Sequence, residues 1–563
     1  MHSATTTASS GFVSGYPRFP DAETSALARE EGDLAAWTRL IGGTGIGAFA
    51  GVAGDFAVAL QLDGRTFLAI DRFAIQTLCY RIDDGVLKFA PRANELADPT
   101  TEIDPQAIFD YLYSHVIPSP RTIFKGIYRV PPAHYVLFED GQLTVAPYWT
   151  PEFREDGSRS FESLRDEFRD LLRQAVARQL ALNGGKAGCF LSGGTDSSTV
   201  AGMIGLVRGT PAATYSIGFQ AEGYDEMAYA RIAARHFNTE HHEYYVTPDD
   251  LVRSIAEVAI HYDQPFGNSS ALPAFYCARM AKENGITRIL AGDGGDELFG
   301  GNSRYAKHRV FDWYQYVPGA VRKGLMEPIL KTDLARRLPL ARKGASYVEQ
   351  ARAPMPDRLA MYNLIARLGL DEVLTPELLA QVDVDAPLRQ QQDVWNGAVT
   401  GSGTNRHLAF DWRFTLAECD LPKVYGTTSL AELDVGFPML DDDLLAFSLR
   451  LPAEYKVKGL KLRWFFKEAL RGFLPDEIIV KKKQGFGLPF GPWATRHDAL
   501  RKLASESVRG LADRGILRTD FVETLLTRHL HEHPGYYGEM IWISMMLEQW
   551  LQSRSPRFTL AGG

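Results

Sequence analysis

A buried apolar run followed by a glycine-rich loop and a helix start constrains this chain more than any other feature. Residues 187–191 read AGCFL, residues 192–194 read SGG, and a helix is expected to begin between Asp196 and Ser198. Glycine accepts positive φ angles and leaves backbone N–H groups open to an anion, while the helix N-terminus adds partial positive charge. Taken alone, this loop fits both a phosphate site and an ordinary turn with Asp as the helix cap.

The segments on either side of the loop alternate between helical and strand patterns. Residues 161–182 have apolar side chains at helical spacing, and later strands are expected in ATYSIGF, HHEYYV and RILAG, with helices between them. This alternation predicts a parallel α/β sheet, in which ligands bind at the carboxyl ends of the strands. After residue 305 the pattern is mainly helical, to about residue 550.

Residues 11–150 follow a different pattern, in which short alternating runs are separated by hairpin signals. Asp-Gly pairs at 63–64, 84–85 and 140–141 predict tight turns between β-strands. The apolar pattern lapses at TPEFREDGSRS, so we expect a β-rich domain over residues 1–155 and a second domain over residues 156–563. Two domains also agree with the length, because 563 residues are too many for one core.

Composition excludes several classes of protein. The formal net charge of -8 provides no basic surface for nucleic acid as the main partner. The four cysteines are far apart and lack metal-binding spacing, which favours a reducing compartment. The N-terminus has no signal-peptide pattern, and the longest apolar window, GAFAGVAGDFAVAL, is too short to cross a membrane. We therefore expect a cytoplasmic protein without membrane contact.

A second acidic loop follows another buried strand. In ILAGDGGDELFGG the strand ends near Ala291, and Gly292, Asp293 and Asp296 follow it. The spacing is not that of an EF-hand. Paired with the first loop, this segment supplies a second carboxylate, beside Asp196, for a Mg²⁺ shared with phosphates.

Several motifs in a fixed order connect the chain to a known family. They are LSGGTDSS, YSIGF followed by YDEMAYAR, DQPFGNSSALP, AGDGGDELFGGNSRY and KKKQGFGLPFGPW. Over nearly its whole length the chain resembles the asparagine synthetase family, which includes asparagine synthetase B and the β-lactam synthetases. The resemblance implies an N-terminal glutaminase-like domain of the Ntn-hydrolase type, a β-rich sandwich. It also implies a parallel-sheet α/β synthetase domain of the ATP-pyrophosphatase type with a helical C-terminal part.

The resemblance also implies a reaction and its binding residues. In this family a carboxylate attacks the α-phosphorus of ATP, Mg²⁺–pyrophosphate leaves, and a nitrogen nucleophile then displaces AMP from the acyl-adenylate. The positions that match the family's pyrophosphate site are Ser192, Gly193, Gly194, Asp196, Ser197 and Ser198. The positions that match its nucleotide lining are Leu191, Ile217, Ala291 and Gly292. Asp196 and Asp296 match the carboxylates that hold Mg²⁺.

Two further residues match catalytic positions. Lys483 matches a lysine that precedes the family's Gly-Phe element, where its charge balances the phosphorus and then the tetrahedral oxyanion; Lys481 and Lys482 compete for this assignment. Asp293 matches a position that holds Glu, Asp or Tyr in the family, and its carboxylate is placed to accept a proton from the attacking nitrogen. Asp263 of DQP is expected at most to shape the substrate pocket.

The residues that hydrolyse glutamine in the family are missing here. Working members carry a cysteine directly after the initiator Met, whereas this chain has His2 and no cysteine before Cys79. The family's RDxxGxxPLYY reads IDRFAIQTLCY, with Ala74 for Gly, and its FASE reads FAPR, with Arg92 for the acid. A misassigned start codon would explain only the missing cysteine. Glutamine hydrolysis is therefore not expected, and nitrogen must come from ammonia, a separate glutaminase or an amine.

Substrate identity stays open at the level of sequence. The family's VEVRVPFLD reads LDVGFPMLD, with Gly436 for Arg, which weakens the case for aspartate as the acid. One hypothesis is a ligase that joins a small-molecule or peptide carboxylate to ammonia or an amine, using ATP and Mg²⁺. A second is an intramolecular cyclase that makes β-lactams or macrolactams, and a third is a nucleotide-binding scaffold without catalysis. A homodimer is compatible with the sequence.

Overall fold

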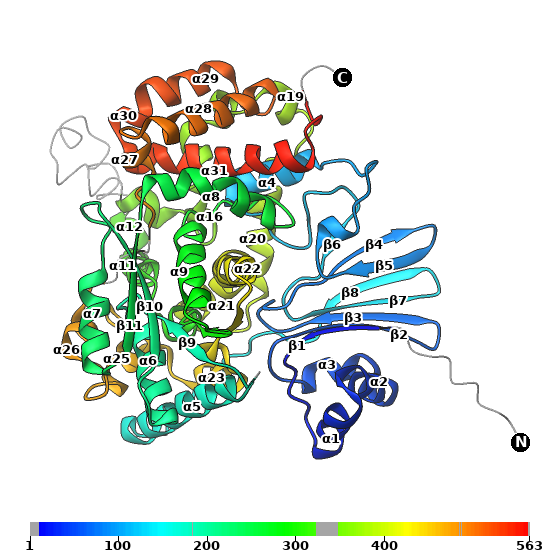
Figure 1. The fold of residues 1–563 in the computed structure, drawn as a ribbon, viewed down its shortest axis with the longest axis vertical. Coiled ribbons are helices and arrows are strands. Elements are labelled where there is room, and N and C mark those ends of the chain that lie inside the picture. Colours follow the sequence, from blue (N-terminus) through cyan, green and yellow to red (C-terminus); the bar gives the residue numbers. More distant parts are fainter. Residues whose placement is uncertain (1–10, 183, 323–346, 483–484, 486, 561–563) are drawn as a thin grey trace, which may run out of the picture.

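The computed structural model describes residues 11–182, 184–322, 347–482, 485 and 487–560. Figure 1 shows the β-sheets of the N-terminal part, in blue and cyan, beside a larger α/β and helical part coloured from turquoise through green to red. The expected order, a β-rich domain followed by an α/β domain with a helical C-terminal part, is confirmed.

The N-terminal domain contains two antiparallel sheets whose hairpins close at the predicted Asp-Gly turns. Asp63, Asp84 and Asp140 have positive φ angles of 51°, 50° and 49°, as hairpin turns of the primed types require. The first sheet has the order β1-β2-β3-β7-β8, with bounds Gly11–Gly15, Phe56–Leu62, Arg65–Ile70, His134–Glu139 and Gln142–Pro147. The second has the order β5-β4-β6, with bounds Val86–Ala90, Cys79–Asp83 and Tyr128–Arg129.

Successive side chains of a strand point to opposite faces, so the first sheet builds a core on each side. Along β2, Ala57 belongs to the core between the two sheets, whereas Phe56 belongs to a core around Trp37. Trp37 lies in helix α2 (Asp33–Thr44), which packs on helix α1 (Ala22–Glu31) and on the first sheet. The predicted β sandwich is therefore present, with a helical layer outside it.

The main sheet of the larger domain consists of five parallel strands in the order β11-β10-β9-β12-β13. In that order their bounds are Glu240–Val246, Ala213–Phe219, Ala187–Phe190, Arg288–Leu290 and Asp434–Gly436. The central strands β9 and β12 are almost completely buried, as expected for a parallel sheet covered by helices. Because β9 and β12 are neighbours and parallel, the loops that follow them leave the same edge of the sheet side by side.

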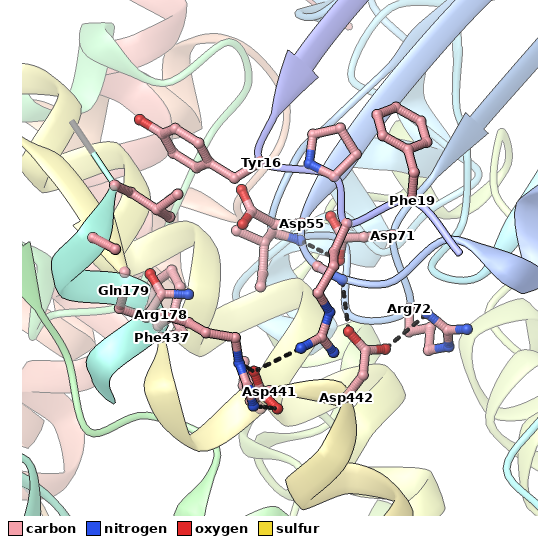
Figure 2. Close-up of a pocket in the computed structure, with 18 of the residues that line it drawn as sticks. Tyr16, Phe19, Asp55, Asp71, Arg72, Arg178, Gln179, Phe437, Asp441 and Asp442 are labelled. Atoms are coloured by element: carbon pink, nitrogen blue, oxygen red, sulfur yellow. Dashed lines mark hydrogen bonds and ion pairs between the residues drawn. The ribbon is translucent and has the colours of Figure 1, made fainter. Parts of the chain in front are cut away.

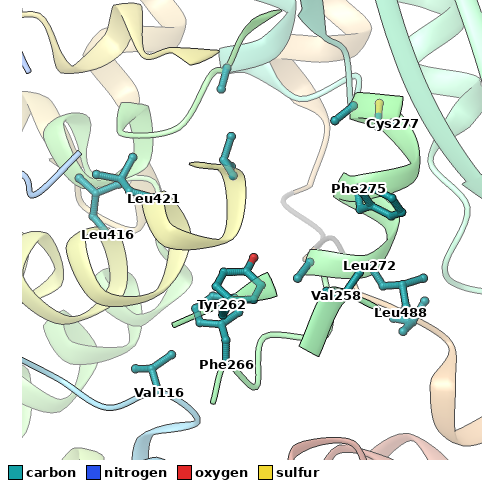
Figure 3. Packing of buried hydrophobic residues seen from close by; sticks show 14 of the residues in the cluster. Val116, Val258, Tyr262, Phe266, Leu272, Phe275, Cys277, Leu416, Leu421 and Leu488 are labelled. Atoms are coloured by element: carbon teal, nitrogen blue, oxygen red, sulfur yellow. The ribbon is translucent and has the colours of Figure 1, made fainter. Parts of the chain in front are cut away.

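The helical part contains a continuous run made of α21 (Gly403–Asp411), η4 (Trp412–Asp420) and α22 (Leu421–Leu430). The middle segment, η4, is a π-helix, a form that occurs frequently at functional sites. Figure 3 shows Leu416 of η4 in one core cluster with Val116, which belongs to the N-terminal domain. One core therefore runs from the N-terminal domain into the larger domain.

The segment that joins the domains lies between β8 and helix α5 (Phe161–Ala181), and it includes the predicted boundary at residues 155 and 156. Glu155 accepts a hydrogen bond from Asn405 Nδ2 at 2.7 Å, so this segment is bound to the larger domain. The exact boundary stays a prediction. No helix in the described part of the chain combines the length and the apolar character that a membrane span requires.

Candidate functional site

A cavity of about 1010 Å³ opens where the loops after β9 and β12 leave the sheet. The predicted residues that line it are Leu191, Ser192, Gly194, Asp196, Ser197, Ile217, Gly292, Asp293 and Asp296. The other predicted members of the same loops, which do not line it, are Gly193, Ser198 and Ala291. Two local sequence patterns, read about a hundred residues apart, therefore lead to one place in the fold.

The first loop is held by its own serine hydroxyls. The hydroxyl groups of Ser192 and Ser197 are hydrogen-bonded to each other, with their Oγ atoms 3.0 Å apart. The Gly194 N–H donates to Ser192 Oγ at 3.3 Å. Helix α6 (Thr195–Arg208) begins directly after this turn, with Gly194 as its N-cap and no side-chain capping bond. A helix N-terminus without a side-chain cap leaves N–H groups for another acceptor. The alternative of a turn capped by Asp196 is therefore wrong.

Gly193 is required by both conformation and space. Its φ angle of +68° is one that L-residues with side chains rarely adopt. A β-carbon at this position would also lie 2.5 Å from the carbonyl carbon of Tyr229, in helix α7 (Met227–His236). The YDEMAYAR motif thus supplies a helix that packs directly on the glycine loop.

Asp196 and Asp296 meet at the guanidinium of Arg463. Nη1 of Arg463 lies 2.6 Å from Asp196 Oδ2 and 2.9 Å from Asp296 Oδ1, and its second nitrogen, Nη2, also bonds Asp196. Burial alone lowers the pKa of Arg463, but the two carboxylates raise it above its ordinary value. The arginine is 5% exposed and packs 4.2 Å from the ring centroid of Phe466. A fixed positive charge therefore stands between the two predicted metal-binding carboxylates.

Glycines of the second loop make room for these carboxylates. A β-carbon on Gly295 would overlap Asp196 Oδ1, and one on Gly301 would overlap Asp296 Oδ1. The glycines of DGGDELFGG thus permit the close approach of the two loops, in addition to forming a turn.

Sequence reasoning missed Arg463. Arg463 is the N-cap of helix α25 (Trp464–Ala469). Its φ angle is +54°, an uncommon conformation for a residue other than glycine. In the sequence it belongs to KGLKLR, a short basic run typical of many solvated surfaces. Nothing in that run indicates a pairing with a residue 267 positions earlier.

Asp293, the predicted proton acceptor, faces a lysine that sequence reasoning also missed. Its Oδ1 lies 3.6 Å from Lys423 Nζ, which lies 3.1 Å from Asp420 Oδ1. Burial raises the pKa of Asp293, and the charge of Lys423 opposes that rise. Lys423 stays charged, because the two carboxylates raise its pKa although burial by itself lowers it.

The three lysines of KKK do not all fall within the described residues. Lys481 lines the cavity, and its Nζ lies 2.8 Å from Glu226 Oε1 and 3.4 Å from the carbonyl oxygen of Gly193. Lys482 also lines the cavity and is exposed. Lys483, the preferred candidate, lies outside the described residues, so its assignment stays a prediction.

The acidic pair fits a metal ion that is shared with phosphate. Mg²⁺ is usually held by one or two protein carboxylates, with phosphate and water oxygens as its other ligands. Among the described residues there is no group of three or more His, Cys, Asp or Glu side chains that could hold a metal alone. Asp196 and Asp296 reach the same guanidinium nitrogen, so their oxygens are close enough to share one cation.

Asp263 does not shape this cavity. Its carboxylate accepts hydrogen bonds from Arg129 Nη2, at 2.9 and 3.0 Å, and from the Ala93 N–H at 2.9 Å. Both donors belong to the N-terminal domain, and Arg92 donates to the carbonyl oxygen of His261 nearby. The expected pocket role of Asp263 is therefore wrong, and the residue joins the two domains instead.

Gly436 also lies away from the nucleotide cavity. It lines a separate cavity of about 480 Å³ between the domains, where Arg72 of the N-terminal domain pairs with Asp442 of the larger domain and Arg178 pairs with Asp441 within the larger domain (Figure 2). A β-carbon on Gly436 would lie 2.9 Å from an Arg288 guanidinium nitrogen. Because Gly436 does not line the nucleotide cavity, the change from the family's Arg leaves the lining of that cavity unaltered.

Comparison with known proteins agrees with this geometry. The family model described as asparagine synthase matches residues 167–552, and the one described as a glutamine amidotransferase domain matches residues 28–149. Asparagine synthetase [glutamine-hydrolyzing] 1 of Bacillus subtilis (strain 168) is 24% identical over 490 residues, which cover 86% of this chain and 74% of that protein.

Two further relatives carry different names. A putative asparagine synthetase [glutamine-hydrolyzing] of Mycobacterium tuberculosis (strain ATCC 25618 / H37Rv) is 26% identical over 458 residues, covering 78% of this chain and 68% of that protein. Amidase chyE of Penicillium rubens is 25% identical over 505 residues, covering 81% and 73%. Because the asparagine synthase model matches well over half of the residues, this chain belongs to the asparagine synthase family of ATP-dependent carbon–nitrogen ligases.

Proposed function

We propose that this protein activates a carboxylate with ATP and then transfers the acyl group to nitrogen. The observation that carries the proposal is the convergence of Asp196, Asp296 and Arg463 beside a glycine loop at a helix N-terminus, within one cavity. Loop N–H groups and a buried guanidinium suit a pyrophosphate leaving group. The absence of a lysine after SGGTDSS distinguishes the loop from those that bind a γ-phosphate.

In the first step a substrate carboxylate oxygen forms a bond to the α-phosphorus of ATP. The bond from that phosphorus to the oxygen bridging to the β-phosphate breaks, and pyrophosphate leaves with the electron pair. Ser192, Gly194 and Ser197 offer donors to pyrophosphate, and Arg463 offers a positive charge. Asp196 and Asp296 would hold Mg²⁺, which when bound neutralises charge on the leaving group.

In the second step a nitrogen nucleophile attacks the acyl carbon and AMP leaves. Asp293 faces the same cavity and is proposed to accept the proton that the attacking nitrogen loses. Lys483 is proposed to balance the charge of the tetrahedral oxyanion. The nitrogen comes from ammonia or an amine, because His2, Pro91 and Arg92 replace residues of the glutamine-hydrolysing relatives' pattern.

One relative favours a range of products wider than asparagine. Amidase chyE, which matches 81% of this chain, is named an amidase and not an asparagine synthetase. The cavity volume of about 1010 Å³ lies at the upper end of ordinary ligand pockets and leaves room for an acid larger than aspartate beside ATP. An intramolecular cyclase therefore remains the second candidate. We also propose a cytoplasmic location, since none of the four cysteines is in a disulfide.

The test is product analysis with ATP labelled in the α-phosphate. Purified protein is given Mg²⁺, ammonium and, one at a time, L-aspartate and a panel of larger carboxylic acids and peptides. At least one acid should yield AMP and pyrophosphate in equal amounts, together with an amide. The Lys125→Met variant, altered at an exposed residue of the N-terminal domain, serves as the matched control. ADP as the only nucleotide product would overturn the proposal.

A further inference from the structure

The acceptor side of the cavity has its own charge arrangement. Among the described residues that line the cavity, every lysine and arginine except Lys423 belongs to residues 461–482. Lys423 lies in α22 and contacts Asp293 and Asp420 instead. Its side chain is 16% exposed, so the pair interactions are only weakly screened by solvent. Lys423 is thus positioned to act on Asp293 and not on the phosphate loop.

The electrostatic effect of Lys423 on Asp293 has a definite sign. Burial raises the pKa of Asp293, Lys423 is the main opposing influence, and Asp420 and Asp196 add to the rise. A carboxyl group can accept a proton only when it is ionised. Removing the charge of Lys423 therefore leaves Asp293 protonated to a higher pH.

The π-helix that leads into α22 is fixed by the N-terminal domain. Ser119 donates to Glu418 Oε1 through its N–H at 3.1 Å and through its Oγ at 2.6 Å. Arg413 donates to Ser119 Oγ at 2.9 Å and pairs with Glu418. Ser119 is 1% exposed and Glu418 is 6% exposed, so this bond network is buried. Asp420, two residues after Glu418, lines the cavity.

The same π-helix also contacts the loop that carries Asp293. Trp412 donates from Nε1 to the carbonyl oxygen of Glu297 at 2.8 Å. Its ring packs edge-on against Phe73 of the N-terminal domain, with centroids 6.2 Å apart. One segment of nine residues, η4, therefore bonds to the N-terminal domain and to the second acidic segment, and its last residue, Asp420, is the partner of Lys423.

We propose that Lys423 is a positioning residue for nitrogen transfer and that the N-terminal domain sets it in place through the π-helix η4. The proposal rests on the function proposed above, since it assigns Asp293 the role of proton acceptor. It gives a domain that has lost the residues for glutamine hydrolysis a task in the reaction of the other domain. It rests on two contacts of the same π-helix: Ser119 bonds to Glu418, and Asp420, two residues later in η4, pairs with Lys423.

The first experiment measures the ratio of amide formed to pyrophosphate released, with the acid found in the panel and ammonium as nucleophile. Lys423→Met should lower this ratio at least tenfold near neutral pH, because the adenylate is hydrolysed before nitrogen attacks. The acidic limb of its pH profile should move up by about one unit or more, a tenfold change per unit at a fixed lower pH. Lys423→Arg, which keeps the charge, should restore most of the ratio. Equal losses in both variants with an unshifted pH profile would overturn the proposal.

The second experiment needs no substrate and uses the full chain. Hydrogen–deuterium exchange is compared between wild type, Ser119→Ala and the control Ser14→Ala, whose hydroxyl bonds Gln76 within the N-terminal domain. Ser119→Ala should raise exchange in residues 412–424 and 293–299 and leave residues 195–208 unchanged. Increased exchange confined to the surroundings of residue 119 would overturn the role of the N-terminal domain. This outcome is independent of whether pyrophosphate is ever released, so it separates this inference from the proposed reaction.

Discussion

Two acidic regions of the molecule use the same side chain in different ways. Asp196 and Asp296 line a cavity and both pair with the guanidinium of Arg463, which is distant in the sequence. Asp71, in the segment IDRFAIQTLCY, is 1% exposed and accepts N–H bonds from its own turn, at Phe73 and Gln76, at 3.0 and 2.9 Å. The carboxylate of Asp71 is bonded by local amides and holds a turn, whereas those of Asp196 and Asp296 line a cavity that is open to a ligand.

The turn around Asp71 keeps the shape of the family motif without its residues. Ala74 has a φ angle of +56° at the position where the family has glycine. Burial raises the pKa of Asp71 to about 7, with the nearby Asp55 adding to the rise. This region therefore retains a scaffold, and the synthetase loops retain groups suited to chemistry. Four predictions break or sharpen this contrast.

The largest expected effect concerns glutamine. Purified wild-type protein should release no glutamate from glutamine above background, because Pro91 and Arg92 stand where the family pattern has residues that help bind glutamine. Ammonium should support amide formation in the same preparation. Glutamate release is followed by a coupled dehydrogenase assay with an active glutaminase as the positive control. Turnover at ordinary enzyme rates, on the order of 1 s⁻¹ or more, would remove the contrast between the two regions.

The second prediction exchanges aspartate for asparagine in both regions. Asp196→Asn and Asp296→Asn should each lower pyrophosphate release by about 100-fold or more, since the leaving group loses its counter-ion. Asp71→Asn should change that rate far less and should lower the urea midpoint instead, because one of the two oxygens that accept the turn's N–H bonds becomes an amide nitrogen, which cannot accept them. Both quantities are measured for all three variants across a Mg²⁺ titration.

The contrast fails if the effects are exchanged. Wild-type pyrophosphate release in Asp196→Asn and Asp296→Asn at every Mg²⁺ concentration would show that these carboxylates only stabilise the loops. A loss of pyrophosphate release in Asp71→Asn without a change of stability would place that residue in the chemistry.

The third prediction concerns the segment that joins the two regions. Lys456 is completely buried and donates to Asn405 Oδ1 at 3.0 Å, while Asn405 donates to Glu155. Burial lowers the pKa of Lys456 to about 7. Above that pH the folded protein lacks a proton that the unfolded chain still binds up to the ordinary pKa of lysine. The free energy of unfolding should therefore rise between about pH 7.5 and 9.5, by about 1 kcal/mol per pH unit.

Lys456→Met removes the titrating group and should flatten this pH dependence. The measurement is urea unfolding of both proteins at several pH values in that range. Identical slopes for the two proteins would mean that Lys456 remains charged in its buried site, held by Glu155.

Local sequence patterns were sufficient for the sheet and for most of the cavity. Both loops follow buried strands of the α/β pattern, and this pattern together with the family motifs predicted that Asp196, Asp293 and Asp296 share one site; the neighbouring strands β9 and β12 bring them to one cavity. Arg463 and Lys423 could not be found in this way. Their partners lie 267 and 130 residues away in the chain, and each pairing exists only because separate helices pack at the same edge of the sheet.

The domain interface was the other feature that the sequence did not reveal. Asp263 lies in a family motif and Arg92 replaces a family residue, so each was interpreted against the chemistry of its own domain. In the structure both side chains form hydrogen bonds across the domain interface. The two domains share a continuous core, which brings these segments of the sequence into contact. Pattern recognition identifies what a motif resembles, whereas packing decides which surface it faces.

The smallest expected effect concerns backbone strain at Ala74, in the turn that follows Asp71. The prediction is that glycine at this position relieves the strain. Ala74→Gly should raise the free energy of unfolding by about 0.5 kcal/mol. The left-handed conformation is strained for alanine, and relief of that strain outweighs the greater conformational entropy that glycine gives the unfolded chain. Ala69→Gly, in β3 and also buried, should instead lower it by about 1 kcal/mol or more, since a strand interior gains nothing from glycine. Urea midpoints of the two variants, measured beside wild type, decide the matter. If both substitutions destabilise the protein equally, the turn at Ala74 is unstrained, and its alanine fits the motif as well as the family's glycine does.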